Sequence, residues 1–72
     1  MSPALPVVGG AEVIAALAEA GFVQVSQRGS HVKLRNAGRT VIVPMHRELA
    51  TGTLRSVLRQ AGLTPAEFIA LL

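Results

Sequence analysis

The fold is decided by one stretch of sequence, in which a polar turn leads directly into an alternating strand: Arg28-Gly29-Ser30-His31-Val32-Lys33-Leu34-Arg35. Successive side chains of a β-strand point to opposite faces of the sheet, so residues two apart share a face. Val32 and Leu34 therefore form an apolar face that needs a core. His31, Lys33 and Arg35 form the other face, which combines an imidazole with two cations.

Two amphipathic helices are predicted, one before the three strands in the chain and one after them. Apolar residues spaced at i, i+3, i+4 and i+7 form one face of a helix. This spacing predicts a helix over residues 11–20 with Gly21 as its C-terminal cap, and a second helix that Thr51 or Thr53 caps at its start and Gly62 at its end. The first set is Val13, Ala16, Leu17 and Ala20, and the second set is Leu54, Val57, Leu58 and Ala61.

Three short strands with tight links predict an antiparallel meander. The first link is a turn over residues 27–30. The second is a hairpin connection over 36–38, with its glycine in a left-handed conformation. Pro44 ends the last strand, and Val23 and Val25 share one face of the first. The predicted strands are residues 22–26, 31–35 and 39–43.

The predicted fold class is α+β, with an α-β-β-β-α order and a short extra helix at the C-terminus. Thr64-Pro65-Ala66-Glu67 predicts that last helix, because a capping threonine, a proline and a glutamate stand at the positions of a capping box. Both longer helices should cover one face of a three-stranded antiparallel sheet and leave the other open. This is the arrangement of a double-stranded-RNA-binding domain. We expect one domain over 1–72, in which residues 1–10 form an extended arm.

Composition limits the classes of function. The 72 residues include no cysteine, so the chain has neither a disulfide nor a thiolate nucleophile. No apolar run approaches the roughly 18 residues of a membrane span, and the N-terminus lacks the charged region of a signal peptide. The net charge is +3, and all seven cations lie between Arg28 and Arg59. A basic middle is typical of an anion-binding face or of a solvated surface, and charge alone does not decide between them.

Several stretches occur together in an order and at a spacing that resemble a known family. They are Gly21-Phe22, Arg28-Gly29-Ser30-His31, Val41-Ile42-Val43-Pro44-Met45-His46 and Gly52-Thr53-Leu54-Arg55-Ser56-Val57-Leu58-Arg59-Gln60-Ala61-Gly62-Leu63. From about Leu5 to the C-terminus the chain resembles the HicA toxins of type II toxin–antitoxin modules. The resemblance implies a small cytoplasmic ribonuclease that cleaves mRNA without needing translation. It also implies a HicB-type antitoxin that binds the toxin and blocks its site.

The resemblance carries the essential histidine of the family onto His31, and its glycine and serine onto Gly29 and Ser30. Two positions depart from the family pattern. Val32 stands where many members have a second histidine, and Ala11 stands where the first helix often begins with a lysine. The second departure removes a cation from the expected RNA surface.

Histidine exchanges protons near neutral pH, so His31 is the candidate acid–base group. The candidate RNA-binding residues are Arg28, Gly29, Ser30, Lys33 and Arg35. His46 and Arg47 form a secondary candidate pair. His46 would act as a second acid–base group, contact a phosphate or serve only as a loop residue. Arg55 and Arg59 would be solvated helix residues or contacts for RNA or antitoxin.

No metal or other cofactor is expected, because the chain has two histidines, no cysteine, no aspartate and four scattered glutamates. Expected partners are mRNA and the antitoxin, and no membrane. The oligomeric state is left open between a homo-oligomer and a toxin–antitoxin hetero-oligomer. The alternative function is a non-catalytic RNA-binding module of the same fold, and a third is a protein that serves only assembly.

Overall fold

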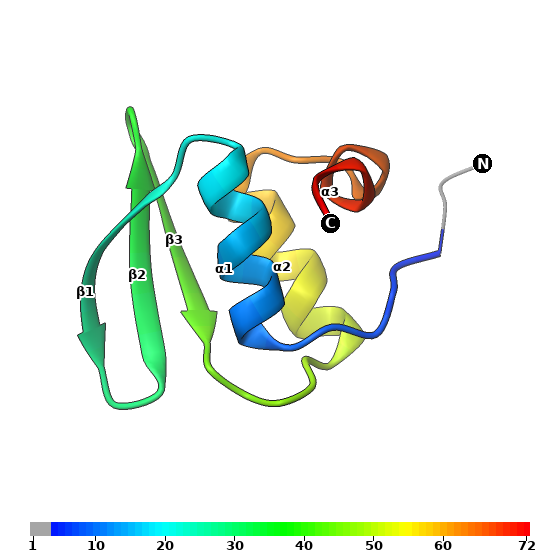
Figure 1. Ribbon diagram of the computed structural model, residues 1–72, viewed down its shortest axis with the longest axis horizontal. Helices are drawn as coiled ribbons and strands as arrows, with labels where there is room; N and C mark the ends of the chain where they lie inside the picture. Colours follow the sequence, from blue (N-terminus) through cyan, green and yellow to red (C-terminus); the bar gives the residue numbers. More distant parts are fainter. Residues whose placement is uncertain (1–3) are drawn as a thin grey trace.

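A computed structural model of the chain describes residues 4–72 (Figure 1). Its element order confirms the predicted α-β-β-β-α fold with an extra C-terminal helix. The predicted arm over residues 1–10 falls partly outside the described residues, and the first helix begins at its last position. The elements are α1 (Gly10–Glu19), β1 (Val23–Arg28), β2 (His31–Asn36), β3 (Arg39–Pro44), α2 (Thr51–Ala61) and α3 (Pro65–Leu71).

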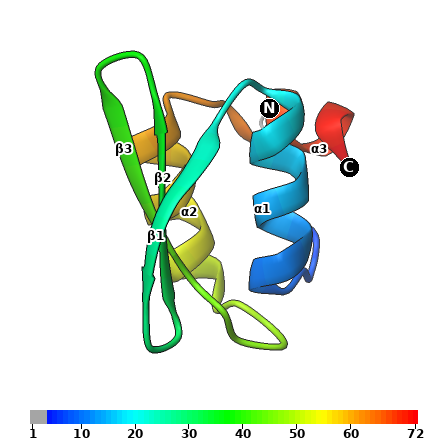
Figure 2. The same ribbon diagram turned by 60° about the vertical axis from the view of Figure 1, so that its left-hand side comes forward.

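The three strands form one antiparallel sheet in the order β1-β2-β3. Helices α1 and α2 lie on the same side of this sheet, as Figure 2 shows, so the prediction of one covered and one open face is confirmed. The core lies between the sheet and these helices, and it is entirely apolar. Its most deeply buried side chains are Val13, Leu17, Val32, Leu34, Val41, Val43, Leu54, Val57 and Phe68.

β1 is longer than predicted, and all of its residues are exposed. It runs from Val23 to Arg28, so only Gly29 and Ser30 remain as the turn. All six of its residues are exposed, because α1 and α2 pack mainly on β3 and leave β1 at the far side of the sheet (Figure 1). A register shift between Gln24 and Ser26 marks a β-bulge, which interrupts the predicted alternation of Val23 and Val25.

The link between β2 and β3 corrects the predicted role of a glycine. Asn36 pairs with Arg39, so the connection is a tight turn of two residues. Its first residue, Ala37, has a φ of 54°, and Gly38 does not adopt the left-handed region. A two-residue hairpin with positive φ at its first position has the φ pattern of a type II′ turn, which places the left-handed residue one position earlier than predicted.

The helix ends follow the prediction except at the start of α2 and at the end of α1, where Ala20 is the C-cap and Gly21 follows it with a φ of 97°. Ala50 is its N-cap and no side chain caps it, so the assignment to Thr51 or Thr53 is wrong. Gly62 ends α2 in a left-handed conformation, as predicted. The capping box of α3 is also confirmed, since the Glu67 backbone N–H donates to Thr64 Oγ1 and the Thr64 backbone N–H donates to Glu67 Oε1. These hydrogen bonds lower the pKa of Glu67. Within residues 4–72 no helix is long and apolar enough to cross a membrane.

Candidate functional site

The open face of the sheet carries the residues that the strand pattern singled out. We call Arg28, His31, Lys33 and Arg35 the basic face. The last three are exposed on β2, while Val32 and Leu34 between them are buried, so the period-two assignment of the two faces is confirmed. Side chains of directly paired residues lie on the same side of a sheet. The pairing of Arg28 with His31 therefore brings a fourth candidate onto this face.

Arg28 and His31 close the tight turn between β1 and β2. Cβ atoms of directly paired residues lie about 4.5–5.5 Å apart, so the two side chains start from neighbouring positions on the same face. Gly29 takes a φ of 58° in this turn, and an added Cβ would meet nothing within 4 Å. Glycine at position 29 therefore allows the left-handed backbone conformation and is not required by close packing. Gln27 Nε2 donates a hydrogen bond to the Gly29 carbonyl oxygen at 3.0 Å and so stabilises the turn. Ser30 is exposed next to His31.

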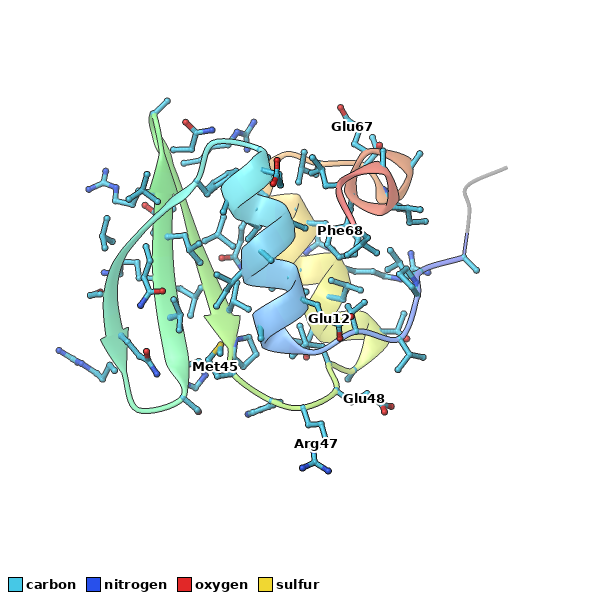
Figure 3. All side chains as sticks on the ribbon, in the orientation of Figure 1. Glu12, Met45, Arg47, Glu48, Glu67 and Phe68 are labelled. Atoms are coloured by element: carbon cyan, nitrogen blue, oxygen red, sulfur yellow. The ribbon has the colours of Figure 1, made fainter. Side chains whose placement is uncertain are left out.

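The loop with His46 and Arg47 lies at the same end of the sheet. Pro44 pairs with His31 across the strands, and the backbone N–H of Met45 donates to the carbonyl oxygen of Ser30. Figure 3 places Met45 beside the end of β3 and shows Arg47 pointing away from the body of the protein. Both candidate histidines are therefore carried by backbone that meets at one end, and both are exposed.

A glycine pair holds this loop against the start of α1. The Gly10 N–H donates to the His46 carbonyl oxygen at 2.9 Å. A Cβ on Gly9 would collide with the carbonyl oxygen of Arg47, and one on Gly10 with that of Pro44. Sequence reasoning treated the pair only as part of an arm. The signal was present, since two adjacent glycines before a helix are typical of a close backbone approach.

The charges of the site are not neutralised within the described part of the chain. Among the seven cations, only Arg39 donates a side-chain hydrogen bond there, to the carbonyl oxygen of Gln60. Glu12 accepts from the backbone N–H of Gly9 at 3.0 Å, and Glu67 belongs to the distant cap of α3. Residues 4–72 contain no group of three or more His, Cys, Asp or Glu side chains suited to a metal ion.

Two other cations that were considered as contacts for RNA or antitoxin do not lie on the basic face. Arg55 and Arg59 are exposed on α2, on the helix side of the sheet, where they line a shallow hollow with Leu58, Leu63 and Pro65. The candidate site therefore consists of the basic face, the turn at residues 29–30 and the loop at residues 45–47. This arrangement offers cations for an anionic ligand and an imidazole for proton transfer.

The family model described as the HicA toxin of bacterial toxin–antitoxin systems matches residues 10–63. The match begins at the first residue of α1 and ends just after α2, so it includes the basic face and the loop but not α3. Comparison with curated proteins finds no match to the chain. Because the family model covers most of the 72 residues, the chain belongs to the HicA family of toxins, and membership of that family implies a cognate antitoxin.

Proposed function

We propose that this toxin is an endoribonuclease that cleaves mRNA without requiring translation, with the whole chain acting as one toxin domain. The observation that carries the proposal is the placement of His31. Its imidazole is exposed on the open face of the sheet, with Arg28 opposite it and with Lys33 and Arg35 along the same strand. A proton-transfer group surrounded by fixed cations is what cleavage of a phosphodiester requires.

RNA carries its own nucleophile in the 2′-hydroxyl group. In the proposed reaction His31 removes the proton of this hydroxyl, and the oxygen attacks the adjacent phosphorus atom. The bond from phosphorus to the 5′ oxygen of the next nucleotide breaks, which leaves a 2′,3′-cyclic phosphate and a 5′-hydroxyl. Water in this open site supplies the proton that the departing oxygen needs. Arg28 and Lys33 stabilise the negative charge that grows on the phosphate oxygens.

The turn and the loop have supporting roles in this proposal. Ser30 and the backbone N–H groups around Gly29 donate hydrogen bonds to a phosphate oxygen, because the turn is exposed and no side chain blocks the glycine. Arg35 extends the cationic surface along the RNA strand. His46 and Arg47 contact a flanking phosphate, since the loop that carries them is held beside the turn.

The reaction is proposed to need no metal ion, because cationic side chains stand where a metal would otherwise stabilise charge. We expect excess EDTA to leave the cleavage rate of the purified toxin on RNA unchanged. A matched reaction with added magnesium serves as the control. Loss of cleavage in EDTA that magnesium restores would contradict this part of the mechanism.

The partner is proposed to be a HicB-type antitoxin that covers the basic face in the cytoplasm, where mRNA is available. An acidic surface on the antitoxin would complement the four cationic or titratable groups of this face. It would also speed encounter of the two proteins. The toxin is then silent while the antitoxin occupies the surface that RNA needs.

Replacement of His31 by alanine tests the proposal. His31 is exposed and packs on no core residue, so the variant should keep its stability within about 0.5 kcal/mol. General acid–base catalysis typically supplies roughly 10²- to 10⁴-fold in rate, and we expect a loss of this size in RNA cleavage. RNA affinity at low salt should fall much less, because Lys33 and Arg35 remain. His46→Ala is the matched control and should reduce cleavage far less.

The outcomes separate the proposal from its alternatives. A folded His31→Ala variant that still cuts RNA at the rate of the wild type would remove His31 from the mechanism. A wild-type protein that binds RNA but never cuts it would indicate a non-catalytic RNA-binding module. No affinity for RNA even at low salt would leave a protein that acts only through assembly.

A further inference from the structure

The two edge strands of the sheet differ in how the rest of the protein covers them. On the β3 edge, the backbone N–H of Ile42 donates to the side-chain oxygen Oε1 of Gln60 at 3.0 Å. Arg39 also reaches α2, where it donates to the carbonyl oxygen of Gln60 at 3.4 Å. Helix α2 therefore occupies this edge and satisfies a backbone group that would otherwise be free to pair.

The β1 edge has no such cover. β1 is the other terminal strand of the sheet, and every one of its residues is exposed. An edge strand presents a row of unpaired backbone N–H and C=O groups, which proteins usually protect with proline, lysine, a β-bulge or a covering element. β1 contains neither proline nor lysine, its only charged residue is Arg28 at its end, and its bulge interrupts the edge at Val25 alone. Its valines are prominently exposed instead, Val23 at 64% and Val25 at 51%.

We propose that the open edge of β1 binds an extended acidic segment of the antitoxin, which adds to the sheet as a fourth strand. Addition of a peptide strand to an exposed sheet edge is a common mode of recognition, in which main-chain hydrogen bonds give affinity and side chains give specificity. The bulge at Val25 leaves Ser26–Arg28 as the regular stretch next to the turn, and the added strand pairs there.

The side chains of β1 specify what such a segment carries. Val23 and Arg28 pair with Arg35 and His31, so both lie on the open face of the sheet. A partner residue opposite Arg28 is best a glutamate or an aspartate, and one that packs on the valines is best apolar. Because Arg28 is the direct neighbour of His31, a strand bound there anchors the antitoxin at the edge of the basic face. The inference rests on the proposed function in one respect: a strand bound here inhibits the toxin only if the basic face binds RNA.

Two other occupants fit the edge less well. A second copy of the toxin brings another +3 charge and a second basic face to the same sheet, and like charges oppose that pairing. Single-stranded RNA binds through phosphate contacts and through bases stacked on aromatic side chains. β1 has no aromatic residue and carries one cation only, and the valines offer nothing to a phosphate. An acidic peptide strand uses the backbone, the valines and Arg28 together.

Amide hydrogen exchange of the toxin alone and in complex tests the pairing directly. The probe is the purified cognate antitoxin. We expect exchange of the outward-facing backbone amides in the Ser26–Arg28 stretch to slow at least tenfold in the complex, because the added strand would accept hydrogen bonds from them. Protection confined to β2 and to the loop at residues 45–47, with β1 unchanged, would overturn the proposal.

A pair of double variants tests the contribution of the valines. Val23→Ser/Val25→Ser removes both apolar side chains of β1 without changing charge. Val7→Ser/Leu72→Ser is the matched control, since these residues are exposed to a similar extent, at 74% and 55%, and lie outside the sheet. We expect the β1 variant to bind the antitoxin about tenfold or more weakly than the wild type, and the control to bind like the wild type. Circular dichroism checks that both remain folded.

Each remaining outcome has a definite meaning. Equal affinity of both variants for the antitoxin would overturn the proposal. Slowed β1 exchange in the toxin alone at high concentration would assign the edge to a second copy. A β1 variant that loses RNA affinity but not antitoxin affinity would assign it to RNA. All of these measurements except the last omit RNA, so a toxin that fails to cleave RNA would refute the nuclease and leave this test intact.

Discussion

β1 and β2 pair with each other except at the bulge at Val25, yet they have opposite relations to the rest of the protein. In β2 exposed and buried residues alternate, so one strand supplies both core and candidate site. In β1 every residue is exposed, although Val23 and Val25 would suit a core as well as Val32 does. The difference lies in what covers each strand, because the two helices on the sheet pack mainly against β3. An apolar residue becomes core only where a second layer lies over it. Val23 lies on the open face, and the other side of β1, with Gln24 and Gln27, extends beyond the helices.

The largest effect that this comparison predicts is on stability. Leu34 is 1% exposed, and truncation of a buried leucine to alanine typically costs about 2–5 kcal/mol. Val23→Ala on the neighbouring strand should change the free energy of unfolding by no more than about 0.5 kcal/mol. Urea denaturation followed by circular dichroism measures both. A domain of this length has a total stability of only about 4–10 kcal/mol, so the first variant should be close to unfolding.

A result in which both variants lose similar stability would break the comparison. It would mean that Val23, which lies on the open face, is covered in solution by a second copy of the chain. Measurement at two protein concentrations checks this, since self-association makes the midpoint depend on concentration.

The element order and the two faces of β2 could be predicted from sequence because the evidence for them is local. The alternation around Val32 and Leu34 and the capping box at Thr64 each lie within a few residues. The burial of β1 could not be predicted, since it depends on how far α1 and α2 extend over the sheet. The N-cap of α2 could not be predicted either. Two threonines suited the N-cap position, but the backbone turns at Ala50, and the chain has no side chain there that can accept a hydrogen bond.

The candidate site was predictable to a similar degree. The sequence alone places His31, Lys33 and Arg35 on one face by their spacing. It does not place Arg28 beside His31, because that depends on the turn being only two residues long. The position of His46 depends on the close contact of Gly10 with Pro44, which is a long-range packing feature without a periodic signal.

A second, smaller effect concerns the cations of β2. Each phosphate neutralised on a single-stranded nucleic acid contributes about −0.7 to the slope of log K against log salt concentration. Lys33→Gln/Arg35→Gln should therefore make the slope for RNA binding shallower by about 1.4. The matched control is Arg55→Gln/Arg59→Gln, which removes the same net charge from α2. Fluorescence anisotropy with a labelled RNA over a range of salt concentrations measures the slopes.

The control variant sharpens the comparison, because net charge alone would change both slopes equally. An equal change in both variants would indicate that RNA responds to the overall charge of the protein. An RNA affinity of the wild type that does not change with salt concentration would contradict RNA binding through the basic face.

The smallest predicted effect concerns the two hairpins that join β2 to its neighbours. Both are two-residue turns with a positive φ at their first residue, which is Gly29 in one and Ala37 in the other. A non-glycine residue in the left-handed region costs about 1–2 kcal/mol, and glycine loses part of this advantage through its greater entropy when unfolded. Gly29→Ala should therefore destabilise the protein by about 1 kcal/mol, and Ala37→Gly should stabilise it by a similar amount.

These two changes form a matched pair, because each exchanges the same two residue types at the same position of the same kind of turn. A Cβ on residue 29 would touch nothing within 4 Å, so packing does not contribute there and only the backbone conformation is tested. Thermal unfolding of both variants and of the double variant measures the effects, and the double variant should return close to the wild-type midpoint. If Ala37→Gly destabilises the protein instead, the turn after β2 does not hold its first residue left-handed in solution. The hairpin between β1 and β2 would then be the only one of the two with a left-handed first residue, and that residue is Gly29, which adopts this conformation readily.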